Sequence, residues 1–230
     1  MSQVDGRCRW IERCLIALTA LGLAAVVPCQ PTVAQSSSSS KFPLQEPAAP
    51  HTTIHLNDDA NDDERVAALL ALVGERLDWM PAVAHSKWIL GVPVHNETRE
   101  HVVLTAAITA TQAAAQQLRR PAPKTQVILN FYAAQIEAAK TLQYRWLEQH
   151  AVKTEASGST TEVQRQRAQE RLNQDIRPAL IALGDKIAVL IIRVAVSPLR
   201  PDAQAVQTAL QRHNLPQEHL EALQQAIEAF

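Results

Sequence analysis

The sequence predicts an all-α protein, built as a bundle of several long helices. Of its 230 residues 47% are hydrophobic, yet only 4% are aromatic and only 6 are glycine. Strands favour β-branched and aromatic residues and tight turns favour glycine, so this composition favours helices. Apolar residues in the first half also recur at the helical spacings of three and four, as in Val66, Leu69, Leu70, Val73 and Leu77.

Residues 1–34 have the pattern of a cleavable signal peptide. Arg7, Arg9 and Arg13 precede an apolar run over residues 14–27, and the small residues of 32–34 suit a cleavage site. A membrane-spanning helix needs about 20 apolar residues, so an uncleaved anchor is the less favoured alternative. We therefore expect a periplasmic or secreted protein with no stable membrane association after cleavage.

Residues 35–60 are rich in serine and proline and are expected to form a flexible tether. Beyond the tether we expect a helical domain over residues 61–197. A helical extension over residues 198–230 is expected to pack on the same domain. The cluster of aspartate and asparagine that ends at Asp63 suits the N-terminus of the first helix.

Three long helices are expected in the first half of the chain, over residues 62–90, 97–119 and 124–150. The first is expected to kink near Trp79–Met80, because Pro81 lacks a backbone donor. Asn96 is the expected N-cap of the second. A fourth long helix, which contains Pro178, and two short C-terminal helices are expected over residues 162–196, 202–213 and 217–230.

Composition and motifs argue against several classes of function. A net charge of −1 argues against nucleic acid as a partner, because phosphate binding normally shows as a basic excess. The 8 histidines show no metal-ligand spacing. All three cysteines fall within the signal segment, and the chain has neither a Gly-x-Ser-x-Gly motif nor a glycine-rich phosphate loop. We therefore expect no metal, no cofactor and no covalent nucleophile.

Two cations in the first helix point to a small anionic ligand. Arg76 and Lys87 are eleven positions apart, which on one continuous helix is about three turns, or roughly 16 Å. They would share an otherwise apolar face. Cations left buried and unpaired are costly, so this pair requires an anionic partner.

Five motifs, in order and with matching internal spacing, make the span from about residue 64 to 194 resemble the all-helical chorismate mutases, particularly their secreted subclass. The motifs are Glu75-Arg76-Leu77, Val83-Ala84-x-x-Lys87-Trp88, Pro93-x-x-Asn96-x-x-Arg99-Glu100, Phe131-x-x-x-Gln135-Ile136-x-Ala138-Ala139-Lys140-x-x-Gln143 and Asp175-Ile176-Arg177-Pro178-x-Leu180-x-x-Leu183. The resemblance implies a helical bundle that converts chorismate, a dianion, to prephenate by a cofactor-free pericyclic rearrangement.

The resemblance also implies four catalytic residues. Arg76 and Arg177 match the arginines that hold the substrate carboxylates, a task for which a planar guanidinium is suited. Lys87 matches the lysine that reaches both a carboxylate and the ether oxygen. Gln143 matches the position opposite Lys87 on that oxygen. As a neutral amide it can donate at any pH.

Five further residues match substrate-binding positions. Arg99 and Glu100 match an Arg-Glu pair at the start of the second helix, where Glu100 would accept the ring hydroxyl. Asn96 stands where the family commonly has aspartate, and Ala139 stands where some members carry a small hydroxylated residue. Val103, one turn after Arg99, would form an apolar wall.

Two other functions stay open beside an exported chorismate mutase. One is a related enzyme of the same fold that eliminates pyruvate from isochorismate, which is a dianion of similar shape. The other is a non-catalytic helical binding module, for which a degraded set of cations would be expected. By resemblance to the secreted subclass we also expect a homodimer.

Overall fold

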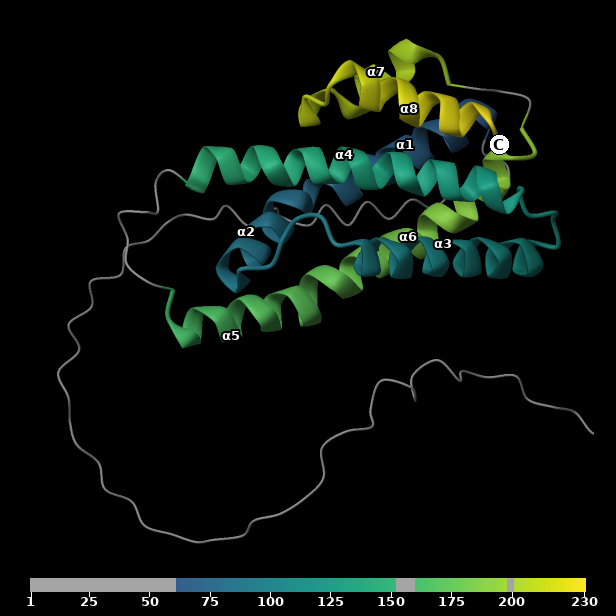
Figure 1. Ribbon diagram of the computed structural model, residues 1–230. Helices are drawn as coiled ribbons and strands as arrows, with labels where there is room; N and C mark the ends of the chain where they lie inside the picture. Colours follow the sequence, from purple (N-terminus) through teal and green to yellow (C-terminus); the bar gives the residue numbers. More distant parts are fainter. Residues whose placement is uncertain (1–60, 152–159, 198–200) are drawn as a thin grey trace, which may run out of the picture. The chain divides into compact units, whose positions relative to one another are not determined.

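The computed structural model describes residues 61–151, 160–197 and 201–230, all within one compact unit, Gln45–Phe230. The predicted signal segment and tether lie outside the described residues. Every regular element within the described ranges is helical, which confirms the predicted all-α class. Figure 1 shows long helices packed side by side, with a shorter pair covering one side of the bundle.

The predicted first helix is divided into α1 (Asp62–Asp78) and α2 (Met80–Leu90). A capping box begins α1: the Asn61 side chain accepts from the backbone N–H of Glu64 at 2.8 Å, and the Glu64 carboxylate accepts from the N–H of Asn61 at 3.0 Å. The break falls at Trp79, where the kink is expected. Because Pro81 lacks an N–H, it is tolerated in the first turn of the new helix.

The next two helices lie within two residues of their predicted bounds. Helix α3 covers Glu97–Leu118 and α4 covers Thr125–Ala151. Asn96 is the N-cap of α3, as expected, and its side chain accepts from the backbone N–H of Arg99 at 2.8 Å. At the other end α3 stops at Arg119, whose φ of 53° is left-handed. That conformation is typical of helix C-termini.

The predicted fourth helix contains a segment that the sequence did not reveal. Helix α5 (Glu162–Arg171) runs into a π-helical turn, Leu172–Ile176, and then into α6 (Arg177–Val194). The N–H of Arg177 donates to the carbonyl of Leu172, five residues before it. Pro178 cannot donate to the carbonyl four residues before it, and a wider turn accommodates the missing bond. The prediction of one regular helix was therefore incomplete.

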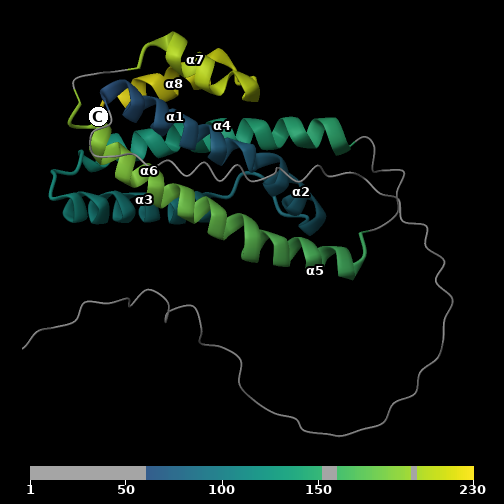
Figure 2. The ribbon, with the colours of Figure 1, turned by 180° about the vertical axis from the view of Figure 1, so that it is seen from behind.

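The C-terminal region forms two short helices, α7 (Ala203–Leu210) and α8 (Gln217–Glu228), joined through a 3₁₀ turn. In Figures 1 and 2 this pair lies against α1 and α4, in agreement with the packing of α7 on α1 and of α8 on α4. Arg212 donates to both carboxylate oxygens of Asp78, at 3.2 and 2.6 Å. Thr141 Oγ1 and His219 Nε2 are hydrogen-bonded at 2.8 Å.

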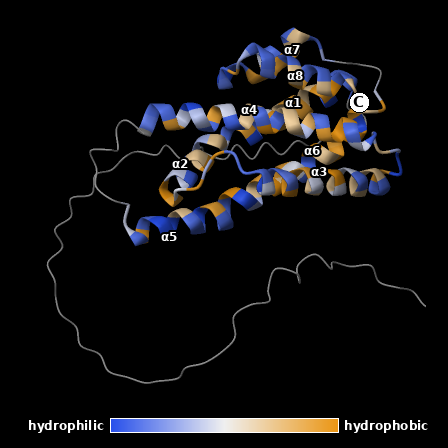
Figure 3. Ribbon diagram, in the orientation of Figure 1, coloured by the Kyte–Doolittle hydropathy of each residue, from blue (hydrophilic) through white to orange (hydrophobic). Residues whose placement is uncertain are grey.

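One main hydrophobic core holds the bundle together. Helix α6 packs on both α1 and α3, and Figure 3 shows hydrophobic residues concentrated where these helices meet, while α5 is mostly hydrophilic. Phe131 on α4 is completely buried, and its ring makes edge contacts with Tyr132 and Phe230 at centroid distances of 5.5 and 5.2 Å. Other completely buried side chains are those of Leu69, Ile128, Ile176, Ile187, Ile191, Leu210 and Leu223.

Candidate functional site

A pocket of about 260 Å³ opens between α3 and α6 and reaches the helices behind them. Cations, small apolar residues and one tyrosine form most of its wall. Among the described residues that line it there is a single carboxylate, Asp185. The lining consists of Arg76, Val83, Lys87, Arg99, Val102, Val103, Ala106, Ala107, Ala110, Tyr132, Leu172, Arg177, Leu180, Ile181, Gly184 and Asp185.

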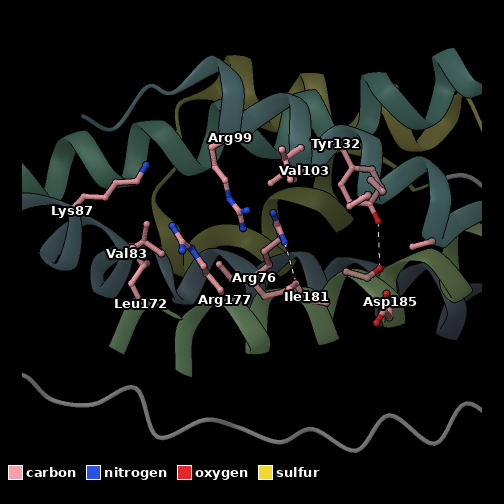
Figure 4. Close-up of a pocket in the computed structure, with 16 residues that line it drawn as sticks. Arg76, Val83, Lys87, Arg99, Val103, Tyr132, Leu172, Arg177, Ile181 and Asp185 are labelled. Carbon is pink, nitrogen blue, oxygen red and sulfur yellow. Dashed lines mark hydrogen bonds between the residues drawn. The ribbon is translucent and has the colours of Figure 1, made fainter. Parts of the chain in front are cut away.

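Four predicted site cations come together at this pocket from four helices. Figure 4 shows the guanidinium groups of Arg76 from α1, Arg99 from α3 and Arg177 from α6 close together in the pocket. The ammonium group of Lys87 from α2 lies to one side of them. Val103, the predicted apolar wall, also lines the pocket. The sequence predicted Arg76 and Lys87 on the first helix, Arg99 on the second and Arg177 on the fourth, and the structure brings the four side chains together.

The positive charge of this cluster is not balanced by carboxylates. Arg76 donates to the backbone carbonyl of Leu180 at 3.3 Å, and Lys87 donates to that of Val94 at 2.8 Å. Arg177 donates to the side-chain oxygen of Asn173. None of the four cations forms an ion pair with a carboxylate of the described residues. Because such a cluster is unfavourable without counter-charge, the pocket is suited to an anion with more than one negative charge.

The pKa values of three of these cations are lowered by burial and by the neighbouring positive charges. Burial lowers the pKa of Lys87, and the charges of Arg177 and Arg99 lower it further, while the carboxylate of Glu100 opposes them. Burial also lowers the pKa of Arg99, with a contribution from Arg177. The pKa of Arg76 is lowered chiefly by burial as well. A bound anion would relieve this repulsion, so each cation favours an anionic ligand.

Two irregular positions in the backbone set the directions of these side chains. The break at Trp79 places Arg76 on α1 and Lys87 on α2. The two cations therefore reach the pocket from two helices, and not from one face of a continuous helix. The π-helical turn acts on Leu172 and Arg177, which are five residues apart and both line the pocket. In a regular α-helix, five residues rotate a side chain by about 140° from its starting face. The wider turn reduces that angle and places both residues on the pocket side.

Four of the predicted site residues do not line this pocket: Gln143, Glu100, Asn96 and Ala139. The Gln143 side chain is buried between α2 and α4. Its Nε2 atom donates to the Ala139 carbonyl at 3.2 Å and contacts the sulfur of Met80 at 3.5 Å, whereas Oε1 is buried without a hydrogen-bond partner. A rotation of the side chain would be needed to turn this amide toward the pocket.

Glu100 lies in a polar network at the start of α3. Its carboxylate accepts from the N–H of Asn96 at 3.4 Å, is 3.0 Å from Nδ1 of His95 and is 3.6 Å from the ammonium of Lys140. Partial burial raises the pKa of Glu100, but the hydrogen bonds from Asn96 and His95 and the charge of Lys140 outweigh burial and lower it. Glu100 is therefore an ionised acceptor. Lys140, which also pairs with Glu137 at 2.6 Å, is a salt-bridge partner.

Two residues of the pocket wall, Tyr132 and Gly184, were not among the predicted site residues. Tyr132 is buried, and its hydroxyl donates to the Gly184 carbonyl at 3.4 Å. Gly184 lies inside α6, where glycine is unfavourable for a helix. That unfavourable glycine is the one signal that could have marked this wall of the pocket in advance.

Asn96 provides a test that separates a structural from a binding role. Asn96→Ala removes the cap of α3 and should lower the free energy of unfolding by about 1 kcal/mol, while Asn96→Asp keeps an acceptor oxygen in place. Urea unfolding followed by circular dichroism measures both variants. Equal stability of Asn96→Ala and the unchanged protein would contradict the capping role.

Two further features are absent from the parts of the chain that the structure describes. No group of three or more His, Cys, Asp or Glu side chains is arranged to hold a metal ion within residues 61–151, 160–197 and 201–230. No described helix is both long and apolar enough to span a membrane.

Comparison with known proteins identifies the fold. No protein-family model and no curated protein matches the sequence. Among solved structures, the secreted chorismate mutase from Yersinia pestis aligns with a TM-score of 0.55 at 21% identity, covering 70% of this chain and 94% of that one. The chorismate mutase from Burkholderia phymatum aligns at 0.51 and 25% identity, covering 74% and 97%. That from Burkholderia thailandensis aligns at 0.50 and 23%, covering 71% and 97%. The chain therefore has the fold of these helical chorismate mutases, as its motifs predicted.

Proposed function

We propose that this protein is a chorismate mutase, which rearranges chorismate to prephenate. The observation that carries the proposal is the convergence of Arg76, Lys87, Arg99 and Arg177 on one largely apolar pocket. Chorismate carries two carboxylates on a compact ring, so its charge complements this cluster. The similarity to three solved chorismate mutases over nearly their whole length adds support.

The proposed mechanism requires no covalent intermediate and no proton transfer. Arg76, Arg99 and Arg177 hold the two carboxylates, which keeps the enolpyruvyl arm folded over the ring, in the geometry from which it reacts. Lys87 then donates to the ether oxygen, where negative charge develops as the carbon–oxygen bond breaks. Lys87 uses one of its three N–H donors on the Val94 carbonyl. Two donors are left for the substrate.

Gln143 and Glu100 complete the proposed site from its other side. A rotated Gln143 would bring its amide N–H to the ether oxygen opposite Lys87. Its unpartnered Oε1 supports this role, because the buried position is not optimal for the amide. Glu100, an ionised acceptor, would bind the ring hydroxyl. Asn96 and Ala139 would contribute at most a neutral amide and an apolar contact.

The direct test is to incubate the protein with chorismate and follow the ultraviolet absorbance of the substrate. Loss of chorismate with formation of prephenate is the expected result. A parallel assay with isochorismate separates the alternatives, since release of pyruvate from isochorismate alone would indicate the lyase. Binding of chorismate without turnover, measured by calorimetry, would indicate a binding module.

The pH dependence of kcat/KM is expected to be flat near neutrality and to decline in alkali. Gln143 is neutral at every pH, and the lowered pKa of Glu100 keeps it ionised. Lys87 must be protonated to donate to the ether oxygen. Because burial lowers its pKa, activity should fall as the pH rises through a value below the usual lysine pKa of about 10.4.

Lys87→Arg is the matched variant for this profile, because arginine keeps its charge at any accessible pH. Whatever activity this variant retains should show no alkaline decline. A steep fall of kcat/KM between about pH 5 and 7 with a single ionisation would contradict the assignment of a neutral amide and a lysine to the ether oxygen.

We also propose that the enzyme is exported and dimeric, with the domain limits that the sequence predicts. Export is supported by the basic and apolar pattern of residues 1–34 and by the secreted mutase among the similar structures. Mass spectrometry of protein recovered from the periplasm would test it, with loss of about 34 residues as the expected result. Light scattering of the recovered protein measures its mass in solution.

A further inference from the structure

The pocket is longer than its cluster of cations. On α3 its lining runs from Arg99 to Ala110, eleven positions, or roughly 16 Å along the helix axis. On α6 it runs from Arg177 to Asp185, eight positions, or about 12 Å. Figure 4 shows the cations toward one end and Tyr132 and Asp185 at the other. We call the second end, lined by Ala106, Ala107, Ala110, Tyr132, Ile181, Gly184 and Asp185, the far compartment.

Gly184 keeps the far compartment open. A Cβ atom added at this position would meet no atom within 4 Å, and its backbone is not left-handed. Neither crowding nor backbone geometry therefore requires glycine here, although glycine inside a helix is about 1 kcal/mol less favourable than alanine. Its effect on the molecule is to leave space in the pocket wall. On α3, the compartment is lined by three alanines, which extend the same space.

The chemistry of the far compartment is mainly apolar. Burial raises the pKa of Tyr132, so its hydroxyl is neutral and donates to the Gly184 carbonyl. Ile181 is 60% exposed and Val102 is 48% exposed, so apolar surface continues to the mouth of the pocket. At the far end, the carboxylate of Asp185 would repel a second anionic group. A complementary ligand is therefore anionic at one end and apolar along the rest.

We propose that the pocket binds amphiphilic monocarboxylates, with the carboxylate among Arg76, Arg99 and Arg177 and the alkyl or aryl body in the far compartment. Such ligands would compete with chorismate for the cations. Gly184 is then a specificity-determining residue, because its missing side chain sets the length of apolar body that fits. The inference rests on the proposed function in one respect only, namely that these cations hold a carboxylate.

Calorimetric titration with butanoate, hexanoate and octanoate tests the proposal without requiring turnover. Each added methylene that leaves water should tighten binding about fourfold. Octanamide, which lacks the charge, and octanedioate, which places a second carboxylate near Asp185, should each bind at least about tenfold more weakly than octanoate. Chorismate added to the protein in the calorimeter should abolish the heat of octanoate binding.

Gly184→Leu should remove the dependence on chain length, so that octanoate binds no more tightly than butanoate. Ala182→Leu is the matched control, because Ala182 lies on the same helix, is exposed and does not line the pocket. It should bind all three carboxylates as the unchanged protein does. Ala110→Leu fills the compartment from α3 and serves as a second variant if Gly184→Leu does not fold.

Three results would overturn the proposal: the same affinity for all three carboxylates in the unchanged protein, a full chain-length dependence in both filled variants, or octanamide binding as tightly as octanoate. A protein that converts chorismate but shows any of these results keeps its proposed function and loses this inference alone. A protein that binds octanoate as described but leaves chorismate unchanged loses the mutase assignment alone.

Discussion

Lys87→Ala is expected to lower kcat by about 10²–10³-fold, which corresponds to the loss of one fixed donor to a developing oxyanion. The ammonium group of Lys87 is the cation that lies beside the guanidinium cluster, so no arginine substitutes for it in the same position. The effect should appear mainly in kcat rather than in KM, because the charge on the ether oxygen develops only in the transition state. The measurement is the initial rate of chorismate loss across a range of substrate concentrations.

Lys186→Ala is the control for this prediction. Lys186 is an exposed residue of α6 that does not line the pocket, so its removal changes the net charge by the same amount and should leave the rate unchanged. Far-ultraviolet circular dichroism should show equal helix content in both variants. Unchanged turnover in Lys87→Ala would refute the proposed site.

Phe131→Ala is expected to lower the free energy of unfolding by about 3–5 kcal/mol. The Phe131 side chain has no exposed surface, and its ring contacts those of Tyr132 and Phe230. Its removal would leave a cavity between α4 and the C-terminal end of the chain. It would also remove a packing contact of Tyr132, which lines the pocket. Urea unfolding followed by circular dichroism at 222 nm measures the change.

Tyr144→Ala is the matched control, because this aromatic residue lies on the same helix but is 47% exposed. Its free energy of unfolding should stay within about 0.5 kcal/mol of that of the unchanged protein. A loss below about 1 kcal/mol in Phe131→Ala would show that its surroundings collapse onto the space or that the core is differently packed.

The regular helices were largely predictable because the residues that begin and end them act locally. Asn96 caps α3 through its own side chain, and Pro81 marks the place where α1 and α2 separate. The π-helical turn was not predictable in the same way. Pro178 signals that a hydrogen bond is missing, but a kink, a break and a wider turn all satisfy that requirement. Tertiary packing decides among them.

The sequence could predict which face of a helix each candidate site residue occupies, because position along a helix fixes the side to which a side chain points. The four cations and Val103, which were predicted in this way, line one pocket. Spacing does not fix the rotamer, however, and Gln143 is turned toward Met80 and the Ala139 carbonyl. Nor does spacing reveal an empty volume. The space at Gly184 depends on which residues of α3 lie across from it.

The five-residue turn before Arg177 also suggests how such a site could be acquired or lost. Compared with an uninterrupted helix, a turn closed by an i→i+5 bond accommodates one additional residue. Loss of a single codon within Leu172–Ile176 would restore a regular α-helix and leave α5 nearly in its present orientation relative to α6. The bundle's own core, which draws little from α5, would persist. An in-frame deletion of one triplet could thus remodel the wall around Leu172 while the remaining architecture is inherited intact.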